Sequence, residues 1–201
     1  MNDNFAHRAA EWDSPEKTKM TEIFVAEMLR YVSLESHWKA LEIGAGTGLV
    51  GMQVIDKVGS MVFEDTSAAM LEILKQKLDN KENIEIVYGE VFEYQKKDID
   101  LVFSCMAFHH IPDLEKTLNH LGNITNTGAT IVIGDLRTED GSFHRFEPIP
   151  HKGFDTEELS KQFQHAGFEV VINQTYHTLA RERTEGNITN YEQFILIAKK
   201  K

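Results

Sequence analysis

The sequence predicts an α/β fold, with helices packed against an open and mostly parallel β-sheet. Short apolar runs alternate with segments of helical periodicity from about residue 39 to residue 198. The first apolar run leads into a glycine-rich turn at residues 44–48, a common way for a strand of a parallel sheet to end. The 201 residues contain no repeat, linker or low-complexity segment, so we expect residues 1–201 to form a single domain.

The first two thirds of the chain begin with a helix and continue as alternating strands and helices. We expect residues 1–35 to form an N-terminal arm and a helix, because Ser14-Pro15 places proline at a first helical position and apolar residues then recur at helical spacing. The expected strands lie at about residues 39–43, 60–64, 84–88, 99–105 and 129–135. The expected helices lie at about residues 47–57 and 67–79, and from about residue 113.

The segment 136–154 has little periodicity and contains two prolines. Loops of this length in a compact domain are usually lids or binding loops, so we expect a lid here. Asp155 then begins a helix that carries a capping pattern and ends at Gly167. Two final strands are expected at about residues 169–174 and 191–198.

The charge balance restricts the classes of partner. With 32 acidic and 21 basic residues the net charge is −11, which disfavours a nucleic-acid partner because phosphate binding needs a basic patch. The single cysteine, Cys105, excludes a disulfide within the chain and fits a reducing compartment. Residues 1–4 are polar, and no apolar run approaches the ~20 residues that cross a bilayer. We therefore expect a cytoplasmic protein without a membrane partner.

The glycine turn predicts a ligand site. Gly44, Gly46 and Gly48 follow an apolar strand, and glycine lets the backbone approach a ligand where a Cβ would collide. Asp65 lies 19 residues beyond Gly46, at the end of the second expected strand. A carboxylate at that place can accept hydrogen bonds from both hydroxyls of a ribose. The pattern therefore predicts a nucleoside-containing ligand at the carboxyl edge of the sheet.

Details of the turn favour S-adenosylmethionine (SAM) over a dinucleotide. A dinucleotide site needs its third glycine three residues after the second, where this chain has Leu49. Glu42, inside the first strand, would also place a negative charge close to a pyrophosphate. SAM has no phosphate, and its amino and sulfonium groups are cationic. A nicotinamide-dependent oxidoreductase stays open as the weaker alternative.

Several segments in the same order resemble the class I SAM-dependent methyltransferases along nearly the whole chain. ALEIGAGTG at 40–48 resembles the first motif of that family, and EDTSAAML at 64–71 resembles the segment after strand two. YGEV at 88–91 resembles the adenine-binding turn. FSCMAFHHIPD at 103–113 resembles the strand-four segment of small-molecule members, including quinone-biosynthesis types, and AEWD at 10–13 resembles their N-terminal lid.

This resemblance implies a Rossmann-like three-layer α/β/α sandwich, with seven strands ordered 3-2-1-4-5-7-6 and strand seven antiparallel. It implies SAM as the cofactor and S-adenosylhomocysteine (SAH) as its product. Glu90 stands where many members have Asp, and either carboxylate can accept from the adenine amino group. The residues expected to bind the cofactor are Trp12, Glu42, Gly44, Ala45, Gly46, Thr47, Gly48, Glu64, Asp65, Thr66, Met70, Gly89, Glu90, Val91, Ser104, Cys105 and Met106.

Histidines are the candidates for catalysis. His109 and His110 lie just past strand four, where an imidazole could take a proton from an oxygen or nitrogen acceptor near neutral pH. His151, and with it His144, lies in the lid segment and could reach the acceptor. Each also has a plainer interpretation, as a packing, capping or surface residue. Methyl transfer needs a base only for some acceptors, since the cofactor supplies the reactivity.

The spacing of the metal-ligating residues does not predict a metal site. No His-x-x-x-His pair accompanies a carboxylate on a clear helix, and Cys105 has no cysteine partner. We therefore expect no metal.

The acceptor is expected to be a small molecule. Residues 104–107 lack the Asn/Asp-Pro-Pro-Tyr sequence and the Pro-Cys pair of nucleic-acid methyltransferases, and the net charge of −11 agrees with this exclusion. A SAM- or SAH-binding protein without catalysis stays open as an alternative, because the sequence marks only the cofactor site well. The sequence does not indicate an oligomeric state.

Overall fold

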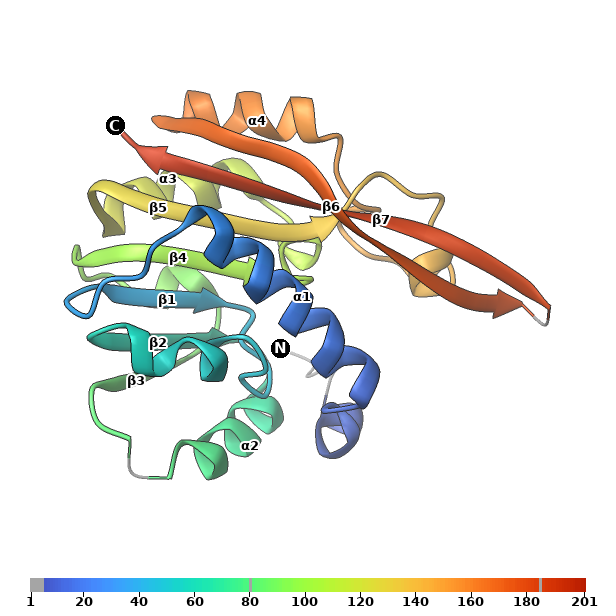
Figure 1. The fold of residues 1–201 in the computed structure, drawn as a ribbon, viewed down its shortest axis with the longest axis horizontal. Coiled ribbons are helices and arrows are strands. Elements are labelled where there is room, and N and C mark those ends of the chain that lie inside the picture. The colour runs from blue at the N-terminus through green and yellow to red at the C-terminus, as the bar shows by residue number, and fades with distance from the viewer. Residues whose placement is uncertain (1–5, 80, 185) are drawn as a thin grey trace.

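A seven-stranded sheet organises the protein, which the computed structural model describes over residues 6–79, 81–184 and 186–201 (Figure 1). The strand order is β3-β2-β1-β4-β5-β7-β6. Strands β1 to β5 are parallel, whereas β7 runs antiparallel to β5 and β6, so the expected topology is confirmed. The strands are β1 (Lys39–Ile43), β2 (Ser60–Asp65), β3 (Ile84–Tyr88), β4 (Ile99–Cys105), β5 (Thr125–Leu136), β6 (Phe168–Thr184) and β7 (Asn187–Lys200).

Each α-helix begins at a side chain that caps its first turn. Ser14, Ser67, Asp113 and Asp155 accept hydrogen bonds from backbone N–H groups of the helices that follow them, which satisfies donors without an intrahelical partner. The predicted starts of these four helices are therefore confirmed. The helices are α1 (Pro15–Tyr31), α2 (Ala68–Leu78), α3 (Leu114–Ile124) and α4 (Thr156–His165). Among the residues that the structure describes, no helix is both long and apolar enough to span a bilayer.

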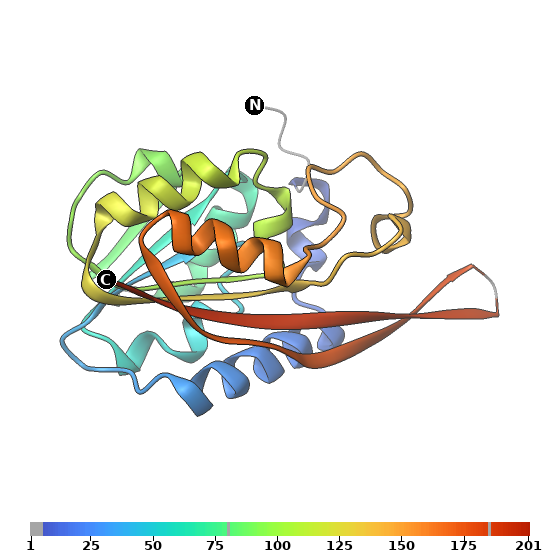
Figure 2. The same ribbon diagram turned by 90° about the horizontal axis from the view of Figure 1, so that it is seen from above.

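Helices cover both faces of the sheet, because the central strands are apolar on both sides. Apolar residues of α3 and α4 pack on one face, and those of α1 and α2 pack on the other (Figure 2). Helix α1 approaches the sheet closely at Gly134 of β5, where a Cβ would lie 2.4 Å from the ring of Phe24. This packing leaves the carboxyl ends of β1, β2, β4 and β5 together at one edge of the sheet.

The prediction of an α-helix at residues 47–57 is wrong. The chain instead forms two short 3₁₀-helices, η2 (Gly51–Gln53) and η3 (Ile55–Lys57). Gly51 lies so close to the sheet that a Cβ there would be 2.3 Å from the ring of Phe63. Val50, Val54 and Ile55 are β-branched, which lowers the preference of this short segment for an α-helix.

The two final strands are much longer than the expected 169–174 and 191–198. β6 and β7 form a hairpin whose far end projects beyond the rest of the sheet (Figure 1). Register shifts interrupt their pairing at three places, including the step between Thr175 and His177. Such irregularities break the period-two alternation by which a strand is recognised in sequence. The middle of the hairpin packs against the segment that follows β5, in a cluster formed by Leu136, Phe143, Leu179 and Tyr191.

Candidate active site

The glycine turn lies at the carboxyl end of β1. Gly44, Gly46 and Gly48 have φ values of +66°, +55° and +83°, a region that residues with a Cβ rarely adopt. A Cβ on Gly44 would lie 2.3 Å from the Cβ of Ala107, and one on Gly48 would lie 2.5 Å from Cδ1 of Leu74. The turn therefore needs glycine both for its backbone conformation and for its close contact with neighbouring elements.

Carboxylates from β2 hold the turn from behind. Oδ2 of Asp65 accepts a hydrogen bond from the Gly46 N–H at 2.6 Å, and its Oδ1 accepts from the Ser67 N–H at 2.7 Å. Oε2 of the buried Glu64 accepts from the Gly44 N–H at 3.4 Å. Asp65, predicted as the ribose partner, thus lies directly beside the turn.

The site is strongly acidic and largely buried. Glu42 of β1 is also buried, and its Oε2 accepts from the Gly51 N–H at 3.0 Å. Burial raises the pKa of Glu42 and of Glu64 well above the usual range, and the nearby charge of Asp65 raises both pKa values further. A cationic ligand would relieve this repulsion, whereas a pyrophosphate would increase it. The carboxylates therefore fit the sulfonium and ammonium groups of SAM better than a dinucleotide.

The N-terminal arm covers the glycine turn. Trp12 follows the short helix η1 (Ala6–Glu11), and its Nε1 lies 3.6 Å from the position that a Cβ on Gly46 would take. Asp13 accepts a hydrogen bond from Oγ1 of Thr47 and forms an ion pair with Lys77. Nζ of Lys77 also donates to the Thr47 carbonyl at 2.7 Å. Asp13 and Lys77 thus clamp the arm to the turn.

The turn after β3 joins the same edge of the sheet. Gly89 has a φ of +125°, and its N–H donates to the Asp65 carbonyl at 3.0 Å. Glu90 is exposed, as a residue that receives an adenine amino group would be. Thr66, at the end of β2, is exposed as well.

Some predicted cofactor residues have buried side chains. Val91 and Met70 are 4% and 2% exposed, and Oγ of Ser104 donates to the Ile43 carbonyl at 3.0 Å. These side chains support the surrounding backbone. Their direct contact with a cofactor stays a prediction.

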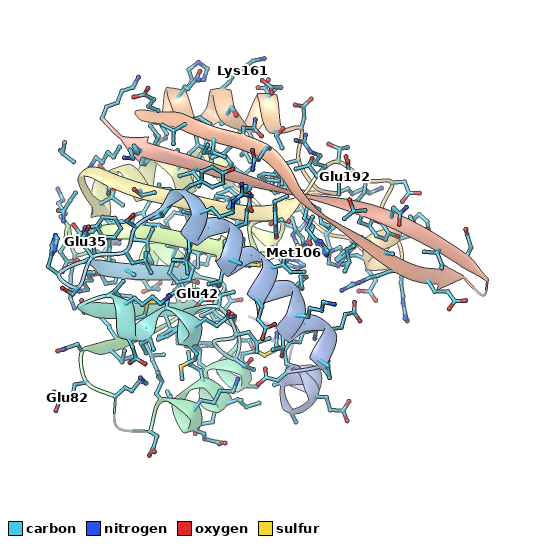
Figure 3. The ribbon with its side chains drawn as sticks, viewed as in Figure 1. Glu35, Glu42, Glu82, Met106, Lys161 and Glu192 are labelled. Atoms are coloured by element: carbon cyan, nitrogen blue, oxygen red, sulfur yellow. The ribbon has the colours of Figure 1, made fainter. Side chains whose placement is uncertain are left out.

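Backbone strain marks the end of β4. Met106 follows the last residue of β4 (Figure 3). It has a φ of +56° without being glycine, and its N–H donates to the Gly134 carbonyl at 2.8 Å. Nε2 of the buried Gln193 donates to Sδ of Met106 at 2.9 Å, and Oε1 of Gln193 has no hydrogen-bond partner among the described residues. Strained residues of this kind concentrate at functional sites. Next to it, burial raises the pKa of the Cys105 thiol, which keeps it neutral and a poor nucleophile.

Three histidines gather beyond β4. Nδ1 of His109 lies 2.6 Å from Oδ1 of Asp135, and both side chains are buried. His144, from the 3₁₀-helix η6 (Ser142–His144), places Nε2 3.0 Å from Nε2 of His109. The ring centroid of His110 lies 4.2 Å from that of His109. Burial, together with His109 and His144, lowers the pKa of His110 to about 3, so this ring is neutral at physiological pH.

His151 lies apart from this cluster. Its Nε2 is 2.9 Å from the Ile111 carbonyl, and its N–H donates to the His109 carbonyl at 3.2 Å. Its ring packs against Phe154, whose N–H donates to the Leu136 carbonyl at 2.9 Å. His151 therefore fastens the lid segment 136–154 to the turn that carries His109.

Comparison with known proteins supports the expected family. Residues 40–128 match the family described as "Methyltransferase domain". A malonyl-[acyl-carrier protein] O-methyltransferase from Ilyobacter polytropus is 28% identical over 134 residues, which cover 65% of this chain and 50% of that protein. The chain therefore spans about half the length of that relative.

Solved structures share the fold over nearly the whole chain. A chain from the complex between the Haloferax volcanii Trm112 methyltransferase activator and a methyltransferase has a TM-score of 0.83 at 16% identity, covering 99% of this chain and 98% of that one. A SAM-dependent methyltransferase from Aquifex aeolicus has a TM-score of 0.72 at 17% identity, covering 96% and 97%. Residues 40–128 thus match a methyltransferase family, and the chain as a whole shares the fold of solved methyltransferases.

Sequence reasoning missed two groups that shape the site. The sequence indicates Asp135 only as the last residue of a strand. A carboxylate at the carboxyl end of a parallel strand is, however, a signal for a functional side chain. Asp13 and Lys77 are ordinary surface charges in the sequence, and only the fold brings them onto Thr47.

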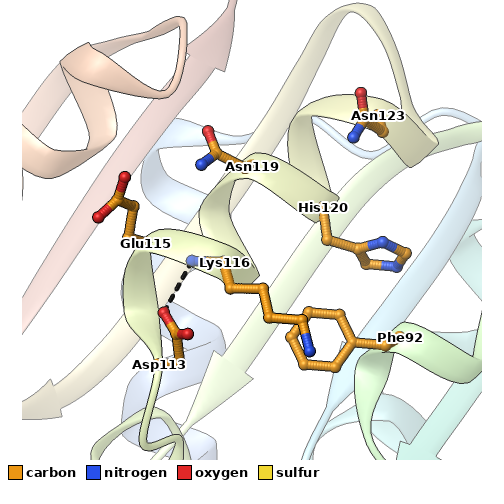
Figure 4. Close-up of a pocket in the computed structure, with 7 residues that line it drawn as sticks. All are labelled: Phe92, Asp113, Glu115, Lys116, Asn119, His120 and Asn123. Atoms are coloured by element: carbon orange, nitrogen blue, oxygen red, sulfur yellow. Dashed lines mark hydrogen bonds between the residues drawn. The ribbon is translucent and has the colours of Figure 1, made fainter.

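A surface hollow of about 460 Å³ lies elsewhere on the protein, along α3 and the turn that holds Phe92 (Figure 4). Asp113 accepts from the Lys116 N–H at 2.9 Å, and Nζ of Lys116 lies 4.0 Å from the centroid of the Phe92 ring. Charged and amide side chains line most of it, and none of the predicted site residues does. We therefore place the site at the carboxyl edge of the sheet.

Proposed function

We propose that this protein transfers the methyl group of SAM to a small-molecule acceptor. The observation that carries the proposal is the glycine turn at positive φ, backed by the buried carboxylates of Glu42, Glu64 and Asp65. SAM would supply a methyl group on a cationic sulfonium that can be displaced in line by a nucleophile. The protein must bind the cofactor, align the acceptor and exclude water.

Residues of three strand ends would hold the cofactor. Asp65 would accept from the ribose hydroxyls while keeping its contact with Gly46, and Glu90 would accept from the adenine amino group. Trp12 would close over the bound cofactor with a large apolar surface. In their ionised form Glu64 and Glu42 would favour a cation in the site, and a bound cation would in turn lower their raised pKa values.

The acceptor would lie between the N-terminal arm and the lid segment 136–154. Oε1 of Gln193 is a buried acceptor atom without a partner among the described residues, and a donor group of the methyl acceptor would satisfy it. His109 and His110 are the proposed proton acceptors for substrates that must lose a proton. The contact of His151 with the Ile111 carbonyl favours a positioning role for that histidine over proton transfer.

The proposed acceptor is an oxygen, nitrogen, sulfur or carbon nucleophile on a small molecule. The net charge of −11 opposes a nucleic-acid acceptor. The segment 103–113 resembles that of quinone-biosynthesis methyltransferases, and the relative from Ilyobacter polytropus is named for malonyl-[acyl-carrier protein]. A demethylated quinone and a malonyl thioester are therefore the first acceptors to test.

Calorimetric titration tests the cofactor. We expect SAH to bind and NADH not to bind, and the reverse result would overturn the proposal. Asp65→Asn should weaken SAH binding by roughly tenfold or more, because hydrogen bonds to a charged group contribute about 1.5–3 kcal/mol each. Asp56→Asn is the matched control, since Asp56 is an exposed carboxylate whose partner is Lys81. Equal SAH affinity in both variants would mean that Asp65 is not the ribose partner.

A transfer assay tests catalysis. Radiolabelled SAM is supplied with a demethylated quinone, with malonyl thioester and with a metabolite extract, and label is followed into extracted products. We expect transfer to one of these. SAH binding without transfer to any of them would support the alternative, a SAM-binding protein without catalysis.

A further inference from the structure

The three clustered histidines have the arrangement of a metal-binding site. One ring nitrogen from each of His109, His110 and His144 lies within 4.8 Å of the others. Two of these residues belong to the 3₁₀-helix η5 (Phe108–His110) after β4, and the third belongs to η6 in the lid segment. We propose that His109, His110 and His144 bind one divalent transition-metal ion of the zinc class.

Asp135 prepares His109 as a ligand. Its carboxylate lies 2.6 Å from Nδ1 of His109, so Nδ1 carries the hydrogen and Nε2 presents its lone pair. The backbone N–H of His109 also donates to Oδ2 of Asp135 at 3.1 Å, which fixes the orientation of the ring. A carboxylate that orients a histidine in this way is the usual outer shell of a zinc ligand.

The spacing of one pair of nitrogens, from His109 and His144, suits a zinc ion after a small movement, and the third nitrogen lies within 4.8 Å of both. Zinc–nitrogen bonds of about 2.0–2.1 Å in a tetrahedral site place two ligand nitrogens about 3.4 Å apart. Nε2 of His144 now lies 3.0 Å from Nε2 of His109, so a shift of a few tenths of an ångström separates this pair enough.

Three imidazoles favour zinc or a similar ion over magnesium or calcium, which prefer oxygen ligands. They would leave a fourth position for water or for a ligand atom of the methyl acceptor, as in catalytic zinc sites. The role of the metal in catalysis rests on the proposed function, and the bound ion would replace His109 and His110 as the group that helps the acceptor to lose its proton. There the ion would lower the pKa of an acceptor hydroxyl or thiol, whose proton leaves to solvent. The resulting anion would form the bond to the methyl carbon as the sulfur–carbon bond of SAM breaks and SAH leaves.

The sequence expectation of no metal rested on helical spacing and on cysteine pairs. His144 lies 34 residues beyond His110 and in a loop, so no spacing pattern reveals the group. A second explanation of the geometry is a hydrogen bond from Nε2–H of His144 to Nε2 of His109. The experiment must separate these two.

The test is titration of the chelator-treated full chain with zinc chloride by calorimetry, and with cobalt(II) by visible absorption. We expect one ion per chain and the intense absorption of four-coordinate cobalt. His144→Ala and His110→Ala should each lower zinc affinity by at least about 10–100-fold, and Asp135→Asn should do so by about 10–100-fold. His165→Ala, at an exposed histidine of α4, should leave zinc affinity unchanged.

Circular dichroism shows whether each variant is folded, and His144→Ala is the main test because His144 lies in a loop. Absence of stoichiometric binding, or equal zinc affinity in wild type, His144→Ala and His110→Ala, overturns the proposal in favour of the hydrogen bond. SAH titration of the same samples keeps the two proposals apart. Zinc loss with intact SAH binding in His144→Ala supports the metal site, whereas SAH binding by a wild type that binds no zinc refutes the metal site alone.

Discussion

Substitution of Gly44 by alanine tests whether the contact between the turn after β1 and the turn after β4 shapes the site. The change adds one methyl group at a residue whose φ is +66°. Its Cβ would lie 2.3 Å from the Cβ of Ala107, where carbon atoms normally stay about 3.5–4.0 Å apart. One of the two turns must therefore move by more than about 1 Å.

The expected loss of stability has two parts. The positive φ costs about 1–2 kcal/mol for any residue with a Cβ, and overpacking costs about 1–3 kcal/mol more. Gly44→Ala should therefore lower the free energy of unfolding by about 2–5 kcal/mol. Gly128→Ala is the matched control, because Gly128 has a φ of +79° and no atom within 4 Å of its Cβ position. That variant should lose only the first part.

Urea unfolding followed by circular dichroism measures both variants, and calorimetry measures SAH binding. The double variant Gly44→Ala/Ala107→Gly should regain most of the overpacking part, less about 0.5–1 kcal/mol for the added flexibility of glycine. SAH affinity should fall in Gly44→Ala and recover in the double variant. The reasoning is refuted if Gly44→Ala costs no more than Gly128→Ala, or if Ala107→Gly restores nothing.

Three further predictions concern the charge of the site and the packing around it. Glu42 and Glu64 have raised pKa values and gain protons as pH falls toward the usual glutamate range, so calorimetry at decreasing pH should show the affinity for SAM falling more than the affinity for SAH, whose sulfur is uncharged. Because the folded state holds these protons more tightly than the unfolded state, the free energy of unfolding without ligand should decrease as pH rises from the usual glutamate range through the raised pKa values; an increase in that range would contradict the assignment. Gly134→Ala should lower the urea midpoint by the equivalent of about 1–3 kcal/mol because its Cβ meets the ring of Phe24, and an unchanged midpoint would mean that α1 is loosely docked. Gly122→Ala should instead raise stability by about 0.5–1 kcal/mol, since this residue lies inside α3 and its Cβ would meet only the Ala166 carbonyl at 3.5 Å.

Strands β1 to β4 could be placed from sequence almost residue by residue, because each is a short apolar run that a turn residue ends. Residues 39–43, for example, stop at Gly44, and residues 99–105 match β4 at both ends. The same reasoning failed at residues 47–57, where packing of Gly51 against Phe63 overrides the helical pattern. It also failed in the β6–β7 hairpin, because bulges disturb the alternation on which strand prediction depends.

The site was predictable where its residues follow a strand directly. The residues of the glycine turn, Asp65 and His109 lie at the sheet edge as expected, since the carboxyl ends of parallel strands meet there. The pairing of His109 with Asp135 and His144 was not predictable. It depends on the path of the segment 136–154, which carries no periodic signal. It also depends on Asp135, which the sequence indicates only as the last residue of a strand.

The clamp of Asp13 on Thr47 and Lys77 has a kinetic consequence. The side chains of the Asp13–Lys77 pair are 37% and 29% exposed, and such surface ion pairs contribute only about 0–1 kcal/mol. The arm that carries Trp12 is therefore held closed by weak contacts and opens at little cost. Salt screens these contacts further, so the rate at which the nucleoside ligand exchanges with solvent should rise with ionic strength. We therefore expect the arm to act as a gate whose speed is set by surface charge, while buried carboxylates hold the glycine turn beneath it.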